Sequence, residues 1–357
     1  MFGKSKVSID DVRAALSKVM DPDLHQDVVS LGMISDISVE GTLAKFTLTL
    51  TTPACPVKEI IEEDCRKAVQ SLEGIEKVEM ESKASVASTR KIAGREPVPG
   101  IKQIIAVTSG KGGVGKSTVA VNLAIALATE GASVGILDAD ITAPNVPLMM
   151  GTEGYQPKAR DNQFIIPAEN FGVKVMSMSF FVSKDTPIIW RGPMLDKAIK
   201  QFLRDVDWGQ LDYLIVDMPP GTGDAQLTMC QATNLSGGVI VTTPQDVALL
   251  DGRKAYAMFE QMQIPVFGFI ENMSYFQCPN CQHQADIFSH GGGAGLAKEL
   301  GVPLLGEIPI DLSVRVGGDS GKPITAMDKN HPVSQAFIKA ARQLAAQASI
   351  KSLAPVG

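Results

Sequence analysis

One stretch of this sequence combines glycines, a lysine and a hydroxyl residue in the spacing of a phosphate-binding loop, or P-loop. Gly110 is followed by four residues and then by Gly115-Lys116-Ser117. Glycines in such a loop let backbone N–H groups surround phosphates, the lysine reaches the β- and γ-phosphates, and the serine binds magnesium. The pattern predicts a site for ATP and Mg2+ formed by Gly110, Gly112, Gly113, Val114, Gly115, Lys116, Ser117 and Thr118.

The same glycines allow a second interpretation as a dinucleotide site. Gly110, Gly112 and Gly115 also satisfy G-x-G-x-x-G, and Asp138 follows about twenty residues later at the end of an apolar run, as such a fold requires. Two features favour the nucleoside triphosphate. Lys116-Ser117 has no role at a dinucleotide site, and Asp217 ends a second apolar run in the manner of a Walker B aspartate.

A pair of cysteines, Cys278 and Cys281, lies in the run C-P-N-C. Two thiolates at this spacing bind soft metals, form redox disulfides or have no chemical role. The pair does not open a helix after an early strand, so a thioredoxin-like role is disfavoured. Zinc is a strong candidate, because His283 and His290 could complete a set of four ligands in one chain.

The other three cysteines have weaker chemical signals. Cys65 and Cys230 lie in apolar helical stretches, which is typical of buried core cysteines. Cys55 lies in a turn between a strand and a helix, and a nearby helix N-terminus would lower its pKa and favour the thiolate. Burial and a role in cluster transfer are both open for Cys55.

The elements that position these residues fall into two predicted domains, because 357 residues exceed one compact core. Residues 1–86 predict a small α+β domain, with a helix that Ser8 caps, an alternating strand at 45–50, a helix at 57–72 and a closing strand. Residues 87–100 are rich in polar residues and proline, which predicts a solvated linker. Residues 101–357 form the second predicted domain.

The second domain alternates short apolar runs with helical stretches. Such runs, between helices, predict an α/β fold whose parallel sheet is covered by helices on both faces. The runs lie at residues 104–109, 133–140, 173–178, 212–219, 237–244, 265–271 and 302–309.

Composition narrows the class of partner. The formal net charge of −6 gives no reason to expect nucleic acid, which binds basic surfaces. No run approaches the roughly 18 apolar residues of a membrane span, and the N-terminus lacks the apolar core of a signal peptide. Five cysteines are an odd number, mostly far apart, which fits a reducing cytoplasm better than a disulfide framework.

A second lysine in the loop indicates a family. Lys-Gly-Gly-Val-Gly-Lys-Ser at residues 111–117 resembles the deviant P-loop of the MinD-like and ArsA-like dimeric ATPases. The resemblance implies a homodimer in which Lys111 crosses to the partner's nucleotide, where it would neutralise phosphate charge as an arginine finger does. The alternative is a solvated loop lysine.

Further segments match the same resemblance. Residues 138–145 look like switch I, so Asp140 would position the attacking water and Asp138 would lie near the magnesium shell. Residues 217–224 look like switch II, with Asp217 holding magnesium through water. A helix cap or loop carboxylate is the alternative for Asp140. The resemblance also implies that Asn272 reads the adenine and that Pro309 and Asp311 line the other side of the base, although such residues often serve only in turns.

The cysteine pair and its context resemble one branch of these ATPases, the Mrp (ApbC-like) iron–sulfur cluster carriers, along residues 102–346. The run Glu271-Asn272-Met273-Ser274 and the segment Trp190–Met194 match this branch too. It implies that Cys278 and Cys281 of two subunits together hold one bridging 4Fe–4S cluster, in preference to zinc. Residues 20–55 resemble the small domain of SufT- and PaaD-type assembly factors.

The function implied is a carrier that passes iron–sulfur clusters to acceptor apoproteins, with a cluster scaffold as possible donor. Slow ATP hydrolysis, with Lys111, Lys116 and Asp140 as catalytic residues, would set how long the dimer stays closed. Two alternatives remain. A MinD-like ATPase that positions partners on membranes would need a basic, aromatic amphipathic C-terminal helix, whereas residues 332–357 contain one aromatic residue, Phe337, early in the expected helix. A zinc-stabilised regulatory ATPase is the other.

Overall fold

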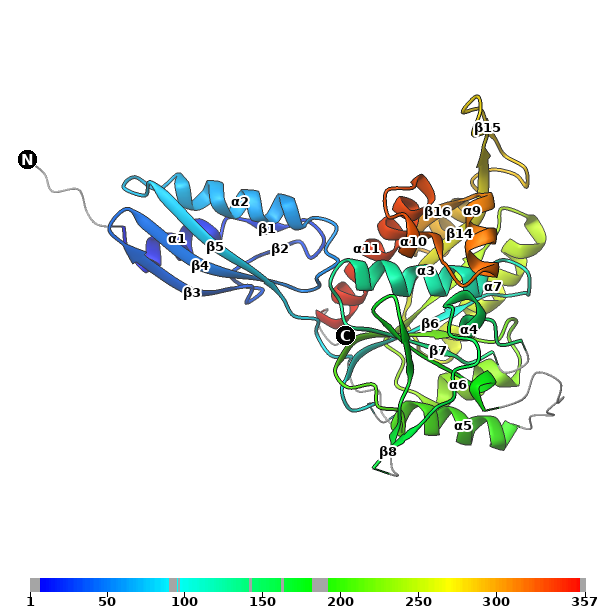
Figure 1. Cartoon of the computed structure of the whole chain (residues 1–357). Helices are drawn as coiled ribbons and strands as arrows, with labels where there is room; N and C mark the ends of the chain where they lie inside the picture. Colours follow the sequence, from blue (N-terminus) through cyan, green and yellow to red (C-terminus); the bar gives the residue numbers. More distant parts are fainter. Residues whose placement is uncertain are drawn as a thin grey trace, which may run out of the picture. The chain divides into compact units, whose positions relative to one another are not determined.

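The computed structural model describes residues 7–89, 95, 97–140, 143–161, 164–181 and 192–353. Within them the chain separates into two compact units, one containing the residues up to Ala87 and the other Ser88–Ser352 (Figure 1). Trp190 and Arg191, which belong to one of the family-like segments, and residues 141 and 142 of the predicted switch I lie outside the described residues.

The first unit is the small α+β fold that its sequence predicts. Its sheet has the order β3-β4-β5, in which β3 is antiparallel and β5 parallel to the central strand. Val12, Leu48 and Ile61 belong to one buried cluster that joins the helices to the sheet. The elements are α1 (Ile9–Leu16), β1 (Met20–Asp21), β2 (Gln26–Asp27), β3 (Ile34–Glu40), β4 (Leu43–Leu50), α2 (Lys58–Gln70) and β5 (Lys77–Ala84).

The start of α1 shows how the sequence sets a boundary. The Ser8 hydroxyl accepts a hydrogen bond from the Asp11 N–H at 3.1 Å, and the Asp11 carboxylate accepts one from the Ser8 N–H at 2.8 Å. This reciprocal capping box satisfies two backbone donors that the first helical turn leaves unpaired. The helix that the sequence predicts after Ser8 is therefore confirmed.

The second unit contains a nine-stranded sheet of order β10-β11-β7-β12-β6-β13-β14-β15, with β16 paired to β14. Only β10 and β15 run antiparallel to their neighbours, so the predicted parallel α/β sheet is confirmed. Its strands are β6 (Ile101–Thr108), β7 (Val134–Asp138), β10 (Ala168–Asn170), β11 (Val173–Ser177), β12 (Leu211–Asp217), β13 (Gly237–Thr242), β14 (Val266–Gln277), β15 (Gln284–Ala285) and β16 (Leu304–Ile310), beside the short pair β8 (Ala159–Arg160) and β9 (Phe164–Ile165).

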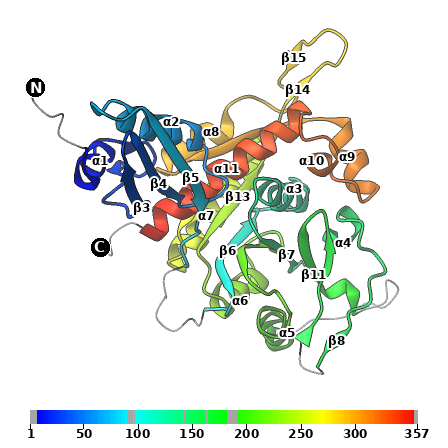
Figure 2. The ribbon, with the colours of Figure 1, turned by 60° about the vertical axis from the view of Figure 1, so that its left-hand side comes forward.

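Helices cover both faces of this sheet (Figures 1 and 2). Buried residues of α5, α6, α7 and α8, among them Phe202, Met229 and Phe259, share one apolar cluster with the sheet. The opposite face carries α3 and α11. The helices are α3 (Lys116–Thr129), α4 (Val146–Met149), α5 (Gly192–Arg204), α6 (Asp224–Ala232), α7 (Asp246–Gln261), α8 (Gly292–Glu299), α9 (Leu312–Asp319), α10 (Ile324–Met327) and α11 (Pro332–Leu353).

Strand register brings the predicted functional residues to one edge of the sheet. Asp217 is paired with Asp138 on β7 and with Val107 on β6. The P-loop follows β6 directly, so two aspartates end their strands beside it. The carboxyl edge of a parallel sheet is where ligands bind in open α/β folds.

The predicted linker is less solvated than its composition suggests. The Thr89 N–H donates to the carbonyl of Lys102 at 2.7 Å, and the Arg95 guanidinium donates to the carbonyl of Met262 at 2.8 Å. Val98 is buried in the core of the second unit. The described part of residues 87–100 therefore contacts that unit, because a few apolar and hydrogen-bonding residues suffice to order a polar segment against an existing surface.

No helix among the described residues has the length and apolar character that a membrane crossing requires.

Candidate nucleotide site and cysteine pair

The P-loop spans the gap between the end of β6 and the start of α3 at Lys116. Gly115 has φ +80°, in the left-handed region, and a Cβ there would lie 2.2 Å from Nδ2 of Asn272. Both the backbone conformation and the close approach require glycine. The N–H groups of the first turn of α3 are thereby directed into the loop, which makes the helix N-terminus an anion-binding position.

Lys116 is almost fully buried and faces two carboxylates. Its Nζ lies 2.6 Å from Oδ1 of Asp217 and 3.9 Å from Oδ2 of Asp140, and it donates to the Ser117 hydroxyl at 3.3 Å. The P-loop lysine, the predicted magnesium serine and the predicted Walker B and water-positioning aspartates are therefore gathered at one point. These are the cationic and oxygen groups that a phosphate with a divalent cation needs.

Asp217 is fully buried at the end of β12. Burial raises the pKa of its carboxyl, and the Lys116 ammonium opposes that shift. One oxygen, Oδ2, has no hydrogen-bond partner among the described residues. A buried carboxylate oxygen without a partner is costly, and Mg2+ prefers hard oxygen ligands. The orphaned oxygen and the Ser117 hydroxyl together fit such a cation.

Asp138 is buried and extensively hydrogen-bonded. Its carboxylate accepts from the Ser177 hydroxyl at 3.1 Å, from the Val146 N–H at 3.2 Å and from the Asp140 N–H at 3.2 Å. Burial, with the Asp217 carboxylate nearby, holds its pKa well above the ordinary value. These bonds fix the chain after β7 and the start of α4. A place near the magnesium shell stays a prediction.

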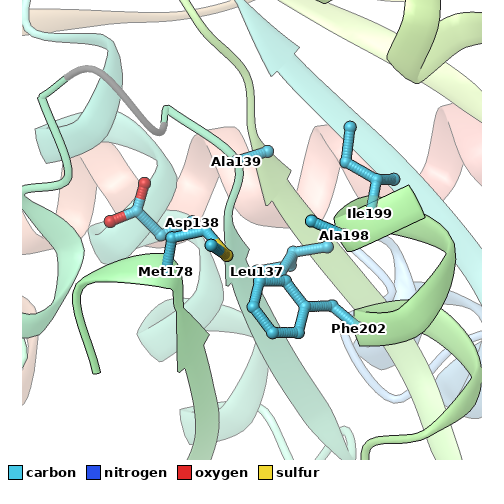
Figure 3. A pocket seen from close by; sticks show the side chains of 7 residues that line it. All are labelled: Leu137, Asp138, Ala139, Met178, Ala198, Ile199 and Phe202. Atoms are coloured by element: carbon cyan, nitrogen blue, oxygen red, sulfur yellow. The ribbon is translucent and has the colours of Figure 1, made fainter. Parts of the chain in front are cut away.

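A small apolar pocket lies beside Asp138 (Figure 3). The carboxylate of Asp138 points away from the ring of Phe202, so it does not face this pocket. The pocket belongs to the packing between β7 and α5 and adds no polar group to the site. It is lined by Leu137, Asp138, Ala139, Met178, Ala198, Ile199 and Phe202.

Asp140 and Lys111 differ in how firmly they are held. Asp140 is buried, and its Oδ1 accepts from the Ala143 N–H at 3.3 Å, as a loop-stabilising carboxylate does. Its Oδ2 also lies 3.9 Å from Lys116 Nζ, and positioning of the attacking water stays a prediction for it. Lys111 is half-buried, and its side chain makes no hydrogen bond or ion pair with the residues that the structure describes.

The predicted adenine residues occupy two different settings. Asn272, on β14, donates from Nδ2 to the Val114 carbonyl at 2.9 Å, which places it directly against the P-loop. Asp311 caps α9 by accepting from the Ser313 N–H at 2.7 Å and from the Ser313 hydroxyl. Pro309 lies near the end of β16. Contact with adenine stays a prediction for all three.

The cysteine pair lies in a hairpin that projects from the second unit (Figures 1 and 2). We call residues 275–292 the cysteine hairpin; it contains the last three residues of β14, all of β15 and the first residue of α8. The Cys278 N–H donates to the His283 carbonyl at 2.9 Å, and the Gln282 N–H donates back to the Cys278 carbonyl at 2.9 Å. These bonds close a tight knuckle around the pair.

The two sulfurs lie at the surface and close to each other. Cys281 is exposed and Cys278 half-buried, and both are free thiols. Hydrogen bonds from the backbone N–H groups of Cys281 and Asn280, and from the Cys281 side chain, lower the pKa of Cys278. Stabilised thiolates of this kind are the ligands of soft metals and iron–sulfur clusters.

A four-ligand zinc site within one chain is not assembled in this structure. Among the described residues, no three Cys, His, Asp or Glu side chains are grouped to hold a metal ion. His290 instead has its Nδ1 3.7 Å from Oδ2 of Asp286. The hairpin therefore offers two sulfur ligands, and a centre with four thiolate ligands would need two more from elsewhere.

The remaining cysteines are core residues or nearly so. Cys65 and Cys230 are buried, as predicted, and burial raises the pKa of each thiol to about 12. The expected pKa depression at Cys55 is wrong. Burial, reinforced by the charges of Asp21 and Asp23, raises its pKa to about 11, because desolvation outweighs the backbone N–H of Val57.

Sequence reasoning gave no role to Glu271. This residue is fully buried on β14, and its carboxylate accepts from the Ser274 hydroxyl at 2.6 Å and from the Gly293 N–H at 2.5 Å. Glu271 ends the apolar run 265–271. An acidic residue at the end of a buried strand was the one signal that could have singled it out.

Comparisons with known proteins agree for both units. The model of the NUBPL iron-transfer P-loop NTPase family matches residues 100–345, and a model of an iron–sulfur cluster assembly protein matches residues 9–81. An iron–sulfur cluster carrier protein of Synechocystis sp. is 49% identical over 351 residues, which cover 97% of this chain and 99% of the relative.

Solved structures resemble the second unit. A nucleotide-binding protein of Archaeoglobus fulgidus, solved in complex with ADP, superposes with a TM-score of 0.59 and 39% identity, covering 68% of this chain and 93% of the other. The cell division ATPase MinD of Pyrococcus furiosus superposes with a TM-score of 0.51 and 25% identity over 68% and 97% of the two chains.

Proposed function

Because the chain belongs to the family of NUBPL iron-transfer P-loop NTPases, we propose that it carries iron–sulfur clusters and passes them to acceptor apoproteins. The observation that carries this proposal is the cysteine hairpin, which presents two thiols at the surface on the same unit as a complete P-loop. The cluster is cargo, received from a donor scaffold and released to an acceptor. Five free thiols suit the cytoplasm as the compartment of action.

The nucleotide is ATP with Mg2+. The buried Lys116 ammonium lies 2.6 Å from Oδ1 of Asp217. Lys116 would hold the β- and γ-phosphates, and Asp217 with Ser117 would hold the magnesium ion, which would offset the phosphate charge. The buried Oδ2 of Asp217 supports this assignment, because it has no hydrogen-bond partner among the described residues and could therefore serve as a cation ligand.

Hydrolysis requires a second copy of the chain. Lys111 lies in the loop without a partner among the described residues of its own chain, so it is available to a neighbouring nucleotide. Facing the partner's γ-phosphate, it would neutralise the charge that develops as water attacks. Asp140 orients that water, and the products are ADP and phosphate.

The same dimer completes the cluster site. Two thiols from each hairpin give the four thiolates that a bridging 4Fe–4S cluster takes. The absence of a third ligand near Cys278 and Cys281, among the described residues, supports a site shared between copies. ATP binding draws the nucleotide faces together, and hydrolysis loosens them and exposes the cluster for ligand exchange with an acceptor.

The first unit assists transfer. It matches an iron–sulfur cluster assembly model, yet the Cys55 thiol, whose pKa is raised to about 11, is held mainly as the neutral thiol. Docking of donor or acceptor proteins suits this unit better than cluster ligation.

The decisive experiment replaces both hairpin cysteines. Cys278→Ala with Cys281→Ala should abolish iron and sulfide in protein reconstituted without oxygen, together with the visible charge-transfer absorbance. ATP affinity should remain, because the backbone bonds of Cys278 stay within the hairpin, to His283 and Gln282. Cys65→Ala with Cys230→Ala is the matched control and should keep the cluster. Zinc bound one per monomer in wild-type protein prepared without oxygen would refute the carrier function.

A further inference from the structure

The base of the cysteine hairpin is closed by a single side chain. Glu271 accepts from Ser274 on the strand that enters the hairpin and from the Gly293 N–H in the helix that leaves it, at 2.6 and 2.5 Å. Residues 275–292, with both cysteines, lie between these two bonds. One buried carboxylate thus ties together the two ends of a segment that otherwise extends away from the unit (Figures 1 and 2).

The position of this carboxylate makes it rigid. Glu271 is 0% exposed, and it is paired in register with Thr242 on β13 and with Glu307 on β16. Its charge has no cationic partner among the described residues. The donors that stabilise it are a hydroxyl and the N-terminus of α8, where the helix dipole favours a negative group. A Cβ on Gly293 would lie 2.7 Å from Oε2, so glycine there permits the contact.

The next residue of the strand contacts the nucleotide site. Asn272 donates from Nδ2 to the carbonyl of Val114, and the same nitrogen packs against Gly115. Neighbouring residues of a strand point to opposite faces of a sheet. One strand therefore places Asn272 against the P-loop and Glu271 against the hairpin base, with one peptide unit between them.

A backbone irregularity marks where the strand leaves the sheet. Met273 has φ +57°, and the register between β14 and β16 shifts between Asn272 and Phe276. A non-glycine residue in the left-handed region is strained and persists only where neighbours enforce it. Here the neighbours are the two anchored side chains Asn272 and Ser274, one on each side of the strained residue.

A second contact reaches the hairpin base from α7. A Cβ on Gly292 would lie 2.6 Å from Leu249 of α7, and a Cβ on Gly110 would lie 2.1 Å from the backbone of Asp251 on the same helix. The helix therefore packs tightly on the first glycine of the P-loop and on the return of the hairpin. Nucleotide loop and cysteine hairpin share two rigid neighbours, β14 and α7.

We infer that Glu271 is a positioning residue: with Ser274 it fixes the pose of Cys278 and Cys281 relative to the P-loop, and it transmits nucleotide occupancy to them. The inference rests on the proposed function. Phosphates in the loop displace the Val114 peptide, and Asn272, which is bonded to it, moves with it. The displacement passes along β14 to the two bonds that Glu271 makes with Ser274 and Gly293. Loss of these two bonds changes the distance between the two cysteine hairpins of the dimer, and with it the affinity for the cluster.

The thermodynamic coupling between ATP binding and cluster binding can be measured, and a purely structural role of Glu271 would not change it. If ATP changes the affinity for the cluster, the cluster must change the affinity for ATP by the same factor. The measurement is the ratio of ATP dissociation constants for cluster-loaded and empty protein, using a non-hydrolysed ATP analogue. Wild-type protein should show a difference of about fivefold or more, the lower range of allosteric coupling.

The variants are Glu271→Gln and Ser274→Ala. Gln keeps the size of Glu271 but removes its charge. Its oxygen can still accept from the Gly293 N–H, but its amide nitrogen meets the Ser274 hydroxyl only as a donor, so that bond is reversed and weakened, whereas Ala at position 274 removes the hydroxyl. Both should leave the ATP affinity of the empty protein unchanged, while the ratio between loaded and empty protein falls to within about twofold of one. If Glu271→Gln does not fold, the smaller change at Ser274 decides.

Asp212→Asn is the matched control. Asp212 also bridges a side chain and a backbone N–H, from Lys102 at 2.9 Å and Ser133 at 3.0 Å, but it lies at the start of β12. It should keep the wild-type ratio. A wild-type ratio in both Glu271→Gln and Ser274→Ala overturns the inference and leaves the carrier intact. A ratio of one in wild-type protein that does hold the cluster overturns the inference and nucleotide gating together.

Discussion

At the scale of single residues, the nucleotide site is a cluster of buried charges around one ammonium. Lys116 is buried between Asp217 and Asp140, and two carboxylates that share one ammonium are not both well compensated. The raised pKa of Asp217 has the same origin, since burial penalises the charged form more than Lys116 restores it. A phosphate with its metal ion would offset these charges, and the unpartnered Oδ2 of Asp217 is a suitable oxygen ligand for that ion.

Cys55 illustrates how burial decides the chemistry of a residue. Its thiol pKa of about 11 keeps it protonated at neutral pH. In native protein at pH 8 we expect alkylation of Cys55 by iodoacetamide to be slow and to rise about tenfold per pH unit, because only the thiolate reacts. Peptide mass spectrometry of protein quenched at successive times measures this rate.

The same reaction in urea provides the reference for Cys55. In the unfolded chain its pKa returns to the ordinary range, so alkylation at pH 8 should be much faster than in the native protein. Equal rates in native and unfolded protein would show that the thiol is neither buried nor shifted.

At the scale of elements, α7 stabilises the P-loop before any nucleotide is present. Gly110 lies so close to the backbone of Asp251 that a Cβ would approach it to 2.1 Å, whereas nothing lies within 4 Å of a Cβ on Gly112. The two positions therefore differ in their structural requirement for glycine. Gly110 allows helix packing, and Gly112 leaves room where the loop is open.

Gly110→Ala should destabilise the nucleotide-free protein by about 1–3 kcal/mol, because either the loop or α7 must move to admit the methyl group. Urea denaturation without nucleotide measures the change. Gly112→Ala is the control, since it neither overlaps a neighbour nor has positive φ, and it should unfold within about 0.5 kcal/mol of wild type. Equal stability of the two variants would argue that α7 is not packed on the loop.

At the scale of the whole molecule, the proposed activity belongs to two chains rather than one. A Lys111→Ala subunit keeps a P-loop that binds ATP but donates no lysine, and a Lys116→Ala subunit has the opposite defect. Each homodimer should lose ATP turnover by on the order of a thousandfold. Mixing the two should restore up to about a quarter of wild-type turnover, because half of randomly assorted dimers are mixed and each contains one complete site.

Phosphate release measured on the mixture and on each variant alone provides the test. The control is a mixture of Lys254→Ala with Lys116→Ala. Lys254 is a surface lysine paired with Asp251. The Lys254→Ala subunit keeps Lys111 and Lys116, so all turnover of this mixture comes from the P-loops of that subunit. Turnover that stays at the level of the single variants after mixing would place Lys111 within its own subunit's site or outside the mechanism.

Much of this molecule is determined by sequence alone, wherever the signal is local. The glycine and lysine spacing at residues 110–117 specifies a phosphate loop, because backbone N–H groups must converge there. Ser8 and Asp11 specify the start of α1 through two bonds only three residues apart. Apolar runs between helices specify the parallel sheet, since only a sheet covered on both faces buries every side chain of such strands.

Tertiary structure alone decided what depends on residues far apart in the chain. Cys55 lies beside a helix start, yet packing half-buries it, and desolvation reverses the expected pKa shift. Val98 and Thr89 belong to a polar segment, yet a neighbouring surface orders them. Glu271 bonds Gly293 across 22 residues, and no local pattern encodes that distance. Local spacing fixes which groups are present, whereas burial and long-range contact fix what each group can do.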